Sequence, residues 1–415
     1  MESDRRQASG RHCMVVFAYY PIGETRVQRE AEALVRSGLD VDILCLRHPT
    51  NRNYRAPRES VGGTTVYRLP VGRSGGDPGL VQQFLEYALF LWLSMVALIG
   101  LHLRHRYDVV QVHNLPDFLV FAAWFPKLLG ARIILDLHDL MPEFFAARFG
   151  RGAKRLLRPL VVLQEQLSCG FADHVITVTE RWRQALIRRG VPASKTSVVM
   201  NLPDEAIFDR STHSWSLPTG DEFRLVYHGA IPARYGLDLV LDAVARLKDE
   251  IAGLSFTVYS GGGHDREVLV DLARRLGITD RVHFRSAVLA TELPALLCQA
   301  DVGVVPYKRG AFTDDLLPTK LLEYTALGIP SIMSRTSAVE AYFSDDMVEY
   351  FESESVEELV SAIRRLYYEP ERLLALSQQS DRFNLLYNWT VESASYTALV
   401  SRLARGRRRA LVDAR

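Results

Sequence analysis

The sequence predicts an α/β protein with two doubly wound domains, each a mostly parallel sheet covered by helices on both faces. Strand-like and helix-like segments alternate along the first half of the chain, and the same alternation restarts after a polar break. The strand-like segments are continuous apolar runs, which are typical of parallel strands buried on both faces. The 415 residues, 48% hydrophobic and 24% charged, provide enough material for two separate cores.

The order of elements predicts the domain limits. The segment 201–222 is polar, contains two prolines and a glycine, and shows no period, so it separates two α/β domains. We assign 1–205 to the first domain, 206–222 to a linker and 223–390 to the second domain, and we expect 391–415 to form a helix that crosses back to the first domain and ends in a basic tail. Expected strands are 13–18, 41–46, 109–113, 132–137, 175–178, 197–200, 223–228, 255–260, 282–285, 302–306 and 330–333; the clearest helices are 26–37, 237–249, 266–276, 292–299, 318–326 and 356–368.

Charge and cysteine content restrict the class of protein. The four cysteines are far apart and form no CxxC pair, so we interpret them as reduced core residues of a cytosolic chain. Residues 1–200 carry 26 basic and 18 acidic side chains, whereas the remainder carries 24 and 31. This asymmetry indicates that the first half faces something anionic, or only that two domains differ in surface charge. The first ten residues are polar, so we expect no secretory leader.

One segment is apolar enough to concern a membrane. Residues 87–103 form a 17-residue apolar run with Glu86 before it and Arg104 and Arg106 after it. A spanning helix needs roughly 17–25 such residues, so a helix lying on the membrane surface fits better than a span. A buried helix of the first domain is the alternative.

The first domain offers polar residues at its predicted strand ends. Gly23 lies in the turn between the first strand and the first helix, where glycine lets a substrate approach the backbone. His113 and His138 follow two neighbouring strands at their carboxyl ends, where open α/β sheets bind ligands. A single histidine at such a place is usually structural, but two of them indicate a polar site.

The second domain offers glycine loops at equivalent places. Gly229 opens a loop after its first strand, and this loop carries Arg234, which is either a phosphate ligand or a solvated surface residue. A run of three glycines around Gly262 follows the next strand, where it either admits a ligand or forms a flexible turn.

The segment 312–324 is the sharpest signal in the sequence. Pro318 suits the first turn of a helix, and the exposed N–H groups of that turn favour a diphosphate. Lys320 adds a positive charge there, and Glu323 lies on nearly the same face, where its carboxylate can accept two ribose hydroxyls. The alternative is a solvated pair on the helix surface.

The block PTKLLEYTALGIPSI and the acids before it resemble the retaining glycosyltransferases of family 4, and the resemblance runs from the first strand to about Leu403. It implies the GT-B fold, in which two Rossmann-like domains face each other across a cleft. Asp315 and Glu323 stand at the two ends of the family's Glu-x7-Glu pattern, which implies contacts with the donor sugar and with the ribose, respectively. The resemblance also implies that His138 contacts the sugar near the reacting carbon and that Gly23 approaches the sugar and the diphosphate.

One departure from the family shifts the expected phosphate contacts. Many members carry arginine and lysine one and six residues after the loop glycine, where this chain has Ala230 and Tyr235. We therefore expect Lys320 to carry more of the diphosphate binding, with Arg234 beside it. The resemblance implies transfer with retention of configuration by front-face attack, with the leaving diphosphate helping to take the acceptor proton. That scheme needs no metal and no cofactor, because the nucleotide-diphosphate sugar is a substrate.

The acceptor side is predicted from the first domain, to which we assign His113 and Glu143. The apolar and basic segments 84–106 and 148–162 predict contact with an anionic membrane surface. We expect a peripheral enzyme at the cytoplasmic face of the cell membrane that extends a saccharide or lipid-linked saccharide, in a bacterial envelope or exopolysaccharide pathway. Nucleic-acid binding is not expected, since the basic residues lack interleaved aromatics. A GT-B-fold nucleotide-sugar epimerase and a non-catalytic nucleotide-sugar-binding protein remain as alternatives.

Overall fold

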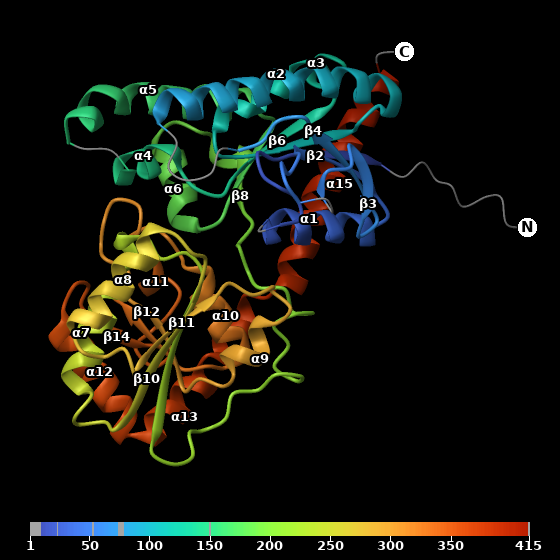
Figure 1. Cartoon of the computed structure of the whole chain (residues 1–415). Helices are drawn as coiled ribbons and strands as arrows, with labels where there is room; N and C mark the ends of the chain where they lie inside the picture. The colour runs from blue at the N-terminus through green and yellow to red at the C-terminus, as the bar shows by residue number, and fades with distance from the viewer. Residues whose placement is uncertain (1–9, 23, 52–53, 74–78, 149–150, 414–415) are drawn as a thin grey trace, which may run out of the picture. The chain divides into compact units, whose positions relative to one another are not determined.

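The computed structural model describes residues 10–22, 24–51, 54–73, 79–148 and 151–413 (Figure 1). The chain divides into two compact units, Met1–Asn201 with Val391–Arg415, and Leu202–Thr390. Each unit contains one sheet with helices packed against it, which confirms the predicted α/β class. The last helix, α15 (Trp389–Asp413), belongs to the first unit from Val391 onward.

The first unit is built on an eight-stranded sheet in the order β3-β4-β2-β1-β5-β6-β7-β8. All neighbouring strands are parallel except β3 and β4, which form an antiparallel pair at one edge. The central strands β5 and β7 are buried along their whole length and β6 is buried after its first residue, as their continuous apolar runs predict. The strands are β1 (Arg11–Val15), β2 (Asp40–Leu46), β3 (Arg58–Val61), β4 (Thr64–Leu69), β5 (Val109–His113), β6 (Arg132–Leu137), β7 (His174–Thr177) and β8 (Thr196–Val198).

Helices of the first unit pack on this sheet through apolar faces. In α1, Val27, Ala31 and Leu34 recur at helical spacing and are buried, and Gly38 ends the helix region with a φ of 89°. The helices are α1 (Thr25–Arg36), α2 (Leu80–His105), η2 (Asp117–Ala123), α3 (Trp124–Leu128), α4 (Met141–Arg148), α5 (Arg151–Phe171), α6 (Glu180–Arg188) and η3 (Ala193–Lys195).

The second unit has a six-stranded, all-parallel sheet in the order β11-β10-β9-β12-β13-β14. Its strands are β9 (Glu222–His228), β10 (Gly253–Ser260), β11 (Val282–Ser286), β12 (Val302–Val305), β13 (Ser331–Ser334) and β14 (Glu349–Phe351). Its helices are η4 (Ala233–Tyr235), α7 (Leu237–Leu247), α8 (His264–Arg275), α9 (Leu293–Leu297), α10 (Thr319–Leu327), α11 (Ser337–Glu340), α12 (Val356–Tyr368), α13 (Pro370–Gln379) and α14 (Asp381–Leu386).

Each sheet has a point at which the strand order reverses. In the first unit β1 pairs with β2 on one side and with β5 on the other. In the second unit β9 pairs with β10 on one side and with β12 on the other. Open α/β sheets bind ligands at the carboxyl ends of the strands at such points. The loops that follow β1, β5, β9 and β12 are therefore the first places to look for a site.

The segment predicted as a linker, 206–222, packs on the second unit. It contains no helix and no strand before Glu222. Phe208 and Trp215 are buried, and the Trp215 Nε1 donates a hydrogen bond to the Asp301 carbonyl oxygen at 3.1 Å. Aromatic burial explains why this polar segment counts with the second unit rather than standing alone.

Helix α2 is long and apolar enough to cross a membrane by length and composition, with a mean hydropathy of 2.0 in its most apolar window. Only 17% of that window is buried, so the alternative of a buried core helix does not fit. Helices α2, α3 and α5 lie in one layer on one side of the first sheet (Figure 1).

Candidate active site

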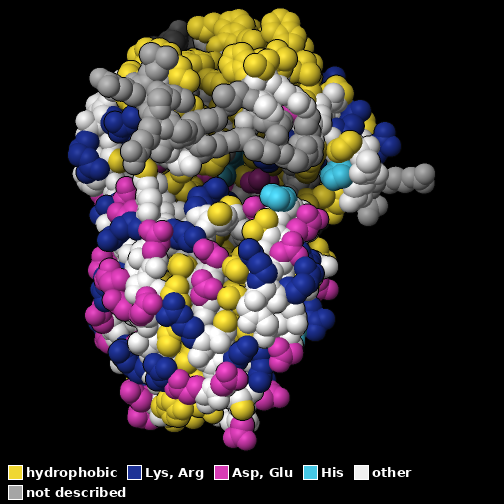
Figure 2. All heavy atoms as spheres, turned by 60° about the vertical axis from the view of Figure 1, so that its left-hand side comes forward, with side chains coloured by type: hydrophobic (Ala, Val, Ile, Leu, Met, Phe, Trp, Pro, Cys, Tyr) yellow, Lys and Arg dark blue, Asp and Glu magenta, His cyan; other side chains and the backbone are white. Residues whose placement is uncertain are grey.

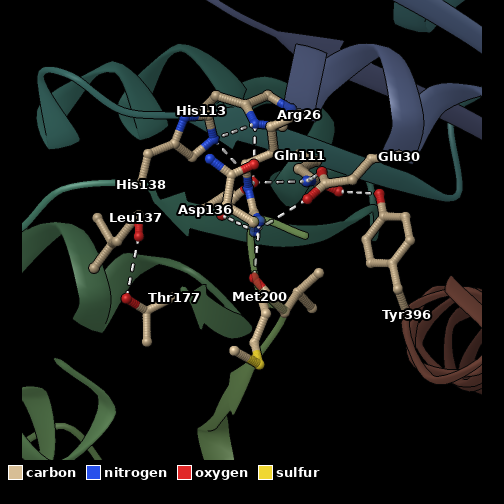
Figure 3. Close-up of polar contacts among 12 residues, drawn as sticks. Arg26, Glu30, Gln111, His113, Asp136, Leu137, His138, Thr177, Met200 and Tyr396 are labelled. Carbon is tan, nitrogen blue, oxygen red and sulfur yellow. Dashed lines mark hydrogen bonds and ion pairs between the residues drawn. The ribbon is translucent and has the colours of Figure 1, made fainter. Parts of the chain in front are cut away.

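At the reversal point of the first sheet, two histidines meet one buried aspartate (Figure 3). His113 ends β5, and Asp136 lies near the end of β6, which His138 follows directly. The His113 Nδ1 and the His138 Nε2 both donate to the Asp136 Oδ2, at 3.0 and 3.1 Å. The His138 backbone N–H donates to the Asn114 Oδ1 at 2.8 Å. His138 is thus held from two directions, and its side chain is 21% exposed.

A buried arginine compensates this aspartate. The Arg26 Nε and Nη2 donate to the two Asp136 oxygens at 3.1 and 2.9 Å, a bidentate pair from the first turn of α1. The same guanidinium lies 3.0 Å from Glu30, one helical turn further on. The Gln111 amide donates to Glu30 at 2.7 Å and accepts the Tyr396 hydroxyl of α15 at 2.7 Å. The cluster therefore joins α1, β5, β6 and the C-terminal helix.

The charges of this cluster set the protonation of the two rings. Burial lowers the pKa of His113 to about 4, so this ring is neutral at physiological pH. Burial also lowers the pKa of His138, but the charge and hydrogen bond of Asp136 outweigh it, and the pKa is raised overall. Burial raises the pKa of Asp136, but the Arg26 and His138 charges hold it well below its usual range. The Asp136 charge therefore favours the protonated, cationic form of His138 at the sheet edge.

These three side chains are also of types that bind metal ions. The ligand atoms of His113, Asp136 and His138 lie within 4.8 Å of one another. The Arg26 guanidinium already occupies both oxygens of Asp136, so a divalent cation would lie beside a buried positive charge. We therefore interpret the group as an ion-pair cluster that orients His138.

Two other predicted residues belong to this unit. Gly23 lies outside the described residues. Its neighbour Glu24 precedes α1, and burial raises the pKa of this carboxyl although the His138 and Arg73 charges lower it. Glu143, in the first turn of α4, pairs with the Arg189 Nη1 at 2.7 Å and is half-buried. Glu143 thus has a structural partner within the first unit, and its assignment to the acceptor stays a prediction.

In the second unit, the Lys320 side chain lies at the reversal point of the sheet, enclosed by three tyrosines. Its Nζ is 4.9 Å from the ring centre of Tyr227 in β9, 5.0 Å from that of Tyr235 in η4, and 5.0 Å from that of Tyr307 after β12. It donates to the Tyr307 hydroxyl at 2.6 Å. Tyr235 and Tyr307 stack with their centres 4.2 Å apart. Cation–π contacts of this kind stabilise a charge where water is excluded.

The loop of Gly229 meets the same lysine. Gly229 has a φ of 98°, and a Cβ built on it would lie 3.8 Å from the Lys320 Cε. Burial lowers the pKa of Lys320 to about 8, and the Glu323 charge limits the fall. The Lys320 side chain therefore reaches from α10 to the loop that carries Gly229 and Tyr235. The Arg234 guanidinium lies over the Tyr235 ring at 5.2 Å, at the exposed side of the same cluster.

Glu323 lies one turn after Lys320 in α10. Its Oε2 is 3.1 Å from the His228 Nε2 at the end of β9, and its side chain is 20% exposed. Asp315 is half-buried in the turn before α10. Its neighbour Asp314 is held in place, because the Ser337 N–H and the Arg309 Nε donate to its Oδ1 at 3.0 and 2.7 Å. Ser337 and Arg309 thus hold Asp314, and the contact of Asp315 with the donor sugar stays a prediction.

Gly262 stands apart from that cluster. It is exposed in the loop between β10 and α8, and a Cβ built on it would meet nothing within 4 Å. The loop therefore has room for a side chain, so close packing does not explain a glycine here. A role for Gly262 in donor binding stays a prediction.

Sequence reasoning missed the residues that support the predicted ones. Asp136 and Arg26 were not selected, although an aspartate inside an apolar strand, as in IILDLHDL, is an unusual buried charge. The sequence predicts only a strand position for Tyr227 and no role for Tyr307, which follows the expected strand 302–306. Tyr227, Tyr235 and Tyr307 surround Lys320 only because three separate segments pack together. No local sequence pattern predicts this contact.

Comparison with known proteins agrees with this architecture. Residues 23–201 match a model described as a glycosyl transferase 4-like domain, and residues 222–369 match one described as glycosyl transferases group 1. The chain is 29% identical over 352 residues to WcaI of Escherichia coli K12, named for colanic acid biosynthesis, which covers 79% of this chain and 82% of that protein.

This chain is also similar to a second named protein and to a solved structure. The GDP-mannose-dependent alpha-(1-6)-phosphatidylinositol monomannoside mannosyltransferase of Mycolicibacterium smegmatis is 29% identical over 195 residues, 46% of this chain and 50% of that one. Sucrose-phosphate synthase from Thermosynechococcus elongatus superposes with a TM-score of 0.75 at 17% identity, covering 96% of this chain and 100% of that one. The structural likeness shows the fold that the two sheets share with that enzyme.

Proposed function

Because the chain belongs to the family 4-like glycosyltransferases of the GT-B fold, we propose that it is a retaining enzyme whose donor is a nucleotide-diphosphate sugar bound by the second unit. The observation that carries this proposal is the enclosed Lys320 ammonium beside the Gly229 loop, with Glu323 one turn away. A buried cation at the reversal point of a parallel sheet is suited to a diphosphate. A carboxylate next to it is suited to the hydroxyls of a ribose.

The proposed reaction assigns each group a task. The bond between the sugar's anomeric carbon and the diphosphate breaks, and its electron pair leaves with the diphosphate. An acceptor oxygen attacks the same face, and its proton passes to the leaving phosphate oxygen. Lys320 and Arg234 stabilise the charge on the diphosphate, Glu323 holds the ribose, and Asp315 and His138 contact the transferred sugar. In this scheme the protein supplies charge and position, without a metal or a cofactor.

A panel of nucleotides tests the donor site. A ligand that binds only the folded state raises the melting temperature by mass action. We expect UDP, GDP or dTDP, or a sugar derivative of one of them, to raise the Tm of the wild type and of Glu340→Ala, a control in the exposed part of α11. Glu323→Ala should lose this shift. The donor assignment fails if no nucleotide shifts the folded wild type, or if Glu323→Ala responds fully.

Two measurements test the chemistry. NMR of the product should show the same anomeric configuration as the donor, and inversion would refute the retaining mechanism. Turnover should survive prolonged treatment with EDTA. A loss restored by a divalent cation would refute metal independence.

We further propose that the enzyme works at the cytoplasmic face of the membrane. The exposed side of α2 carries an uninterrupted apolar stripe, and exposed leucines of α3 and α5 lie in the same layer; Figure 2 shows hydrophobic side chains gathered there. Arg104, Arg106 and Arg158 are exposed in or beside these helices, as binding to an anionic surface requires. The stripe on α2 consists of Val81, Leu85, Leu89, Trp92, Val96 and Leu103.

Vesicle sedimentation tests this surface. Trp92→Asp, at a side chain that is 60% exposed, should abolish binding to anionic vesicles while leaving the Tm nearly unchanged. Val268→Asp in α8, a comparably exposed position of the second unit, is the matched control and should bind normally. Wild-type protein that stays in the supernatant with anionic vesicles contradicts the proposal. Concentration-dependent dimers that Trp92→Asp disrupts would assign the stripe to a second copy instead.

A further inference from the structure

The two ends of the apolar stripe on α2 lie over opposite edges of the first sheet. Helix α2 comes directly before β5 in the chain and runs antiparallel to it. The first turns of α2 therefore lie over the carboxyl edge of the sheet. That edge holds His113 and His138. The opposite end of the helix, with Leu103, lies over the amino edge. The stripe from Val81 to Leu103 therefore runs over about 33 Å of helix, from the far edge of the sheet to the edge that carries the candidate active site.

Aromatic rings connect the stripe to that edge. Phe84 is 61% exposed on α2 and lies 6.3 Å, ring centre to ring centre, from Phe118 in η2. Tyr87 contacts Phe118 at 6.4 Å and Phe17, just after β1, at 4.8 Å. Exposure falls from Phe84 through the half-buried Tyr87 and Phe118 to the buried Phe17. We call Phe17, Phe84, Tyr87 and Phe118 the aromatic bridge.

The bridge joins the polar cluster through adjacent residues. Phe118 follows Asp117, whose Oδ1 accepts the Asn114 amide at 2.9 Å. Asn114 in turn accepts the backbone N–H of His138 at 2.8 Å. Apolar rings and sugar-binding polar groups thus occupy neighbouring places on one edge of one rigid sheet. An apolar core alone would not require a phenylalanine as exposed as Phe84 at this junction.

We propose that the aromatic bridge is the binding site for the apolar chain of the acceptor, so that the acceptor is an amphiphile anchored in the membrane with its saccharide directed toward His138. This deepens, and rests on, the glycosyltransferase function proposed above. The hydrocarbon chain of the acceptor passes from the bilayer over Phe84 to Tyr87 and Phe118, and it contacts apolar groups along this whole path. A saccharide can stack its C–H face on one exposed ring, but only a hydrocarbon chain can follow the series of rings from the exposed Phe84 to the half-buried Phe118. One relative is named for a phosphatidylinositol-linked acceptor, and the rings of this chain offer a place for such a lipid.

Photolabelling in vesicles tests the bridge against the rest of the stripe. The probe is a polyprenyl phosphate with a diazirine in its chain, incorporated at low density into anionic vesicles, and labelled peptides of the full-length protein are identified by mass spectrometry. We expect labels concentrated on residues 84–87 and 118. Phe84→Ala should reduce labelling of residue 118 about tenfold, the effect of losing one large apolar contact. Leu103→Ala, at the other end of α2 and similarly exposed, should leave that labelling unchanged.

Two controls separate the possible failures. Vesicle sedimentation should show that Phe84→Ala and Leu103→Ala bind the bilayer equally well. The nucleotide thermal shift should be the same in both variants and in the wild type. Labels spread evenly along α2, or equal labelling of residue 118 in both variants, would overturn the bridge while leaving the transferase proposal intact. Loss of the nucleotide shift in the wild type would overturn the transferase proposal, whatever the labels show.

Discussion

Donor affinity should depend on the charge of Lys320. The ammonium is enclosed by tyrosines beside the Gly229 loop, and burial lowers its pKa to about 8. A pKa of about 8 leaves about 90% of the lysine charged at pH 7 and about 9% at pH 9. Only the charged form attracts a diphosphate, so affinity is present below the pKa and is lost as the pH rises through it. The dissociation constant of a nucleotide sugar should therefore rise about tenfold between pH 7 and pH 9.

Isothermal titration at intervals between pH 6.5 and pH 9 measures this. Nucleotide sugars are preferred to free diphosphates, since their diphosphate keeps a constant charge over the range. Lys320→Met keeps the volume and removes the charge, so it should bind weakly and without the pH dependence. Lys308→Met is the control, because Lys308 pairs with Asp238 and lies outside the tyrosine cluster. Wild-type affinity that is flat from pH 7 to pH 9, or Lys320→Met that binds as tightly as the wild type, would refute the reasoning.

The same substitution has a stability signature of its own. The pKa of Lys320 is depressed from 10.5 to about 8, so between these pH values the unfolded chain binds more protons and wild-type stability rises with pH. Below pH 8 the buried charge costs up to about 3 kcal/mol. Lys320→Met should therefore be more stable than the wild type at pH 7, and the difference should shrink toward pH 10 in urea denaturation. A less stable Lys320→Met at pH 7 would show that the charge is compensated in the folded state.

Three further predictions concern other parts of the sites. Asp136→Asn should lower the free energy of unfolding by about 3–5 kcal/mol, because it leaves the Arg26 charge buried beside a neutral amide. Urea titrations measure this difference. An unchanged urea midpoint would mean that Glu30 alone compensates the guanidinium. Tyr235→Ala should weaken nucleotide-sugar binding about fivefold in calorimetry, because it removes the cation–π contact with Lys320. Tyr235→Phe keeps the ring and should bind as the wild type does. Equal effects of the two substitutions would show that the ring face does not hold the cation. Gly236→Ala should destabilise the second unit in thermal unfolding, since its φ is 70° and a Cβ would lie 2.0 Å from the Pro306 carbonyl oxygen; a wild-type Tm would show that the loop moves without cost.

Local patterns were sufficient for the regular elements and for part of the site. Continuous apolar runs separated by amphipathic segments predicted the parallel strands and their helices, because burial on both faces leaves a signature within a few residues. The strands β3, β4 and β14 were not predicted. β3 is a half-exposed edge strand, β4 mixes polar and apolar residues instead of forming an apolar run, and β14 is only three residues long. His113 and His138 were found because a polar residue at the end of an apolar run is visible locally. Lys320 and Glu323 were found from one helix turn.

Neighbours along the chain were enough to predict the fold class, the family resemblance and the polar residues at the strand ends. The enclosure of Lys320 by Tyr227, Tyr235 and Tyr307 and the pairing of Arg26 with Asp136 became visible only in the folded arrangement. The packing also shows that α2 turns its apolar stripe outward, whereas its composition left a buried helix as an alternative. Burial, charge compensation and pKa values arise from contacts between segments far apart in the chain, and such contacts exist only after the strands have paired and the helices have packed on them.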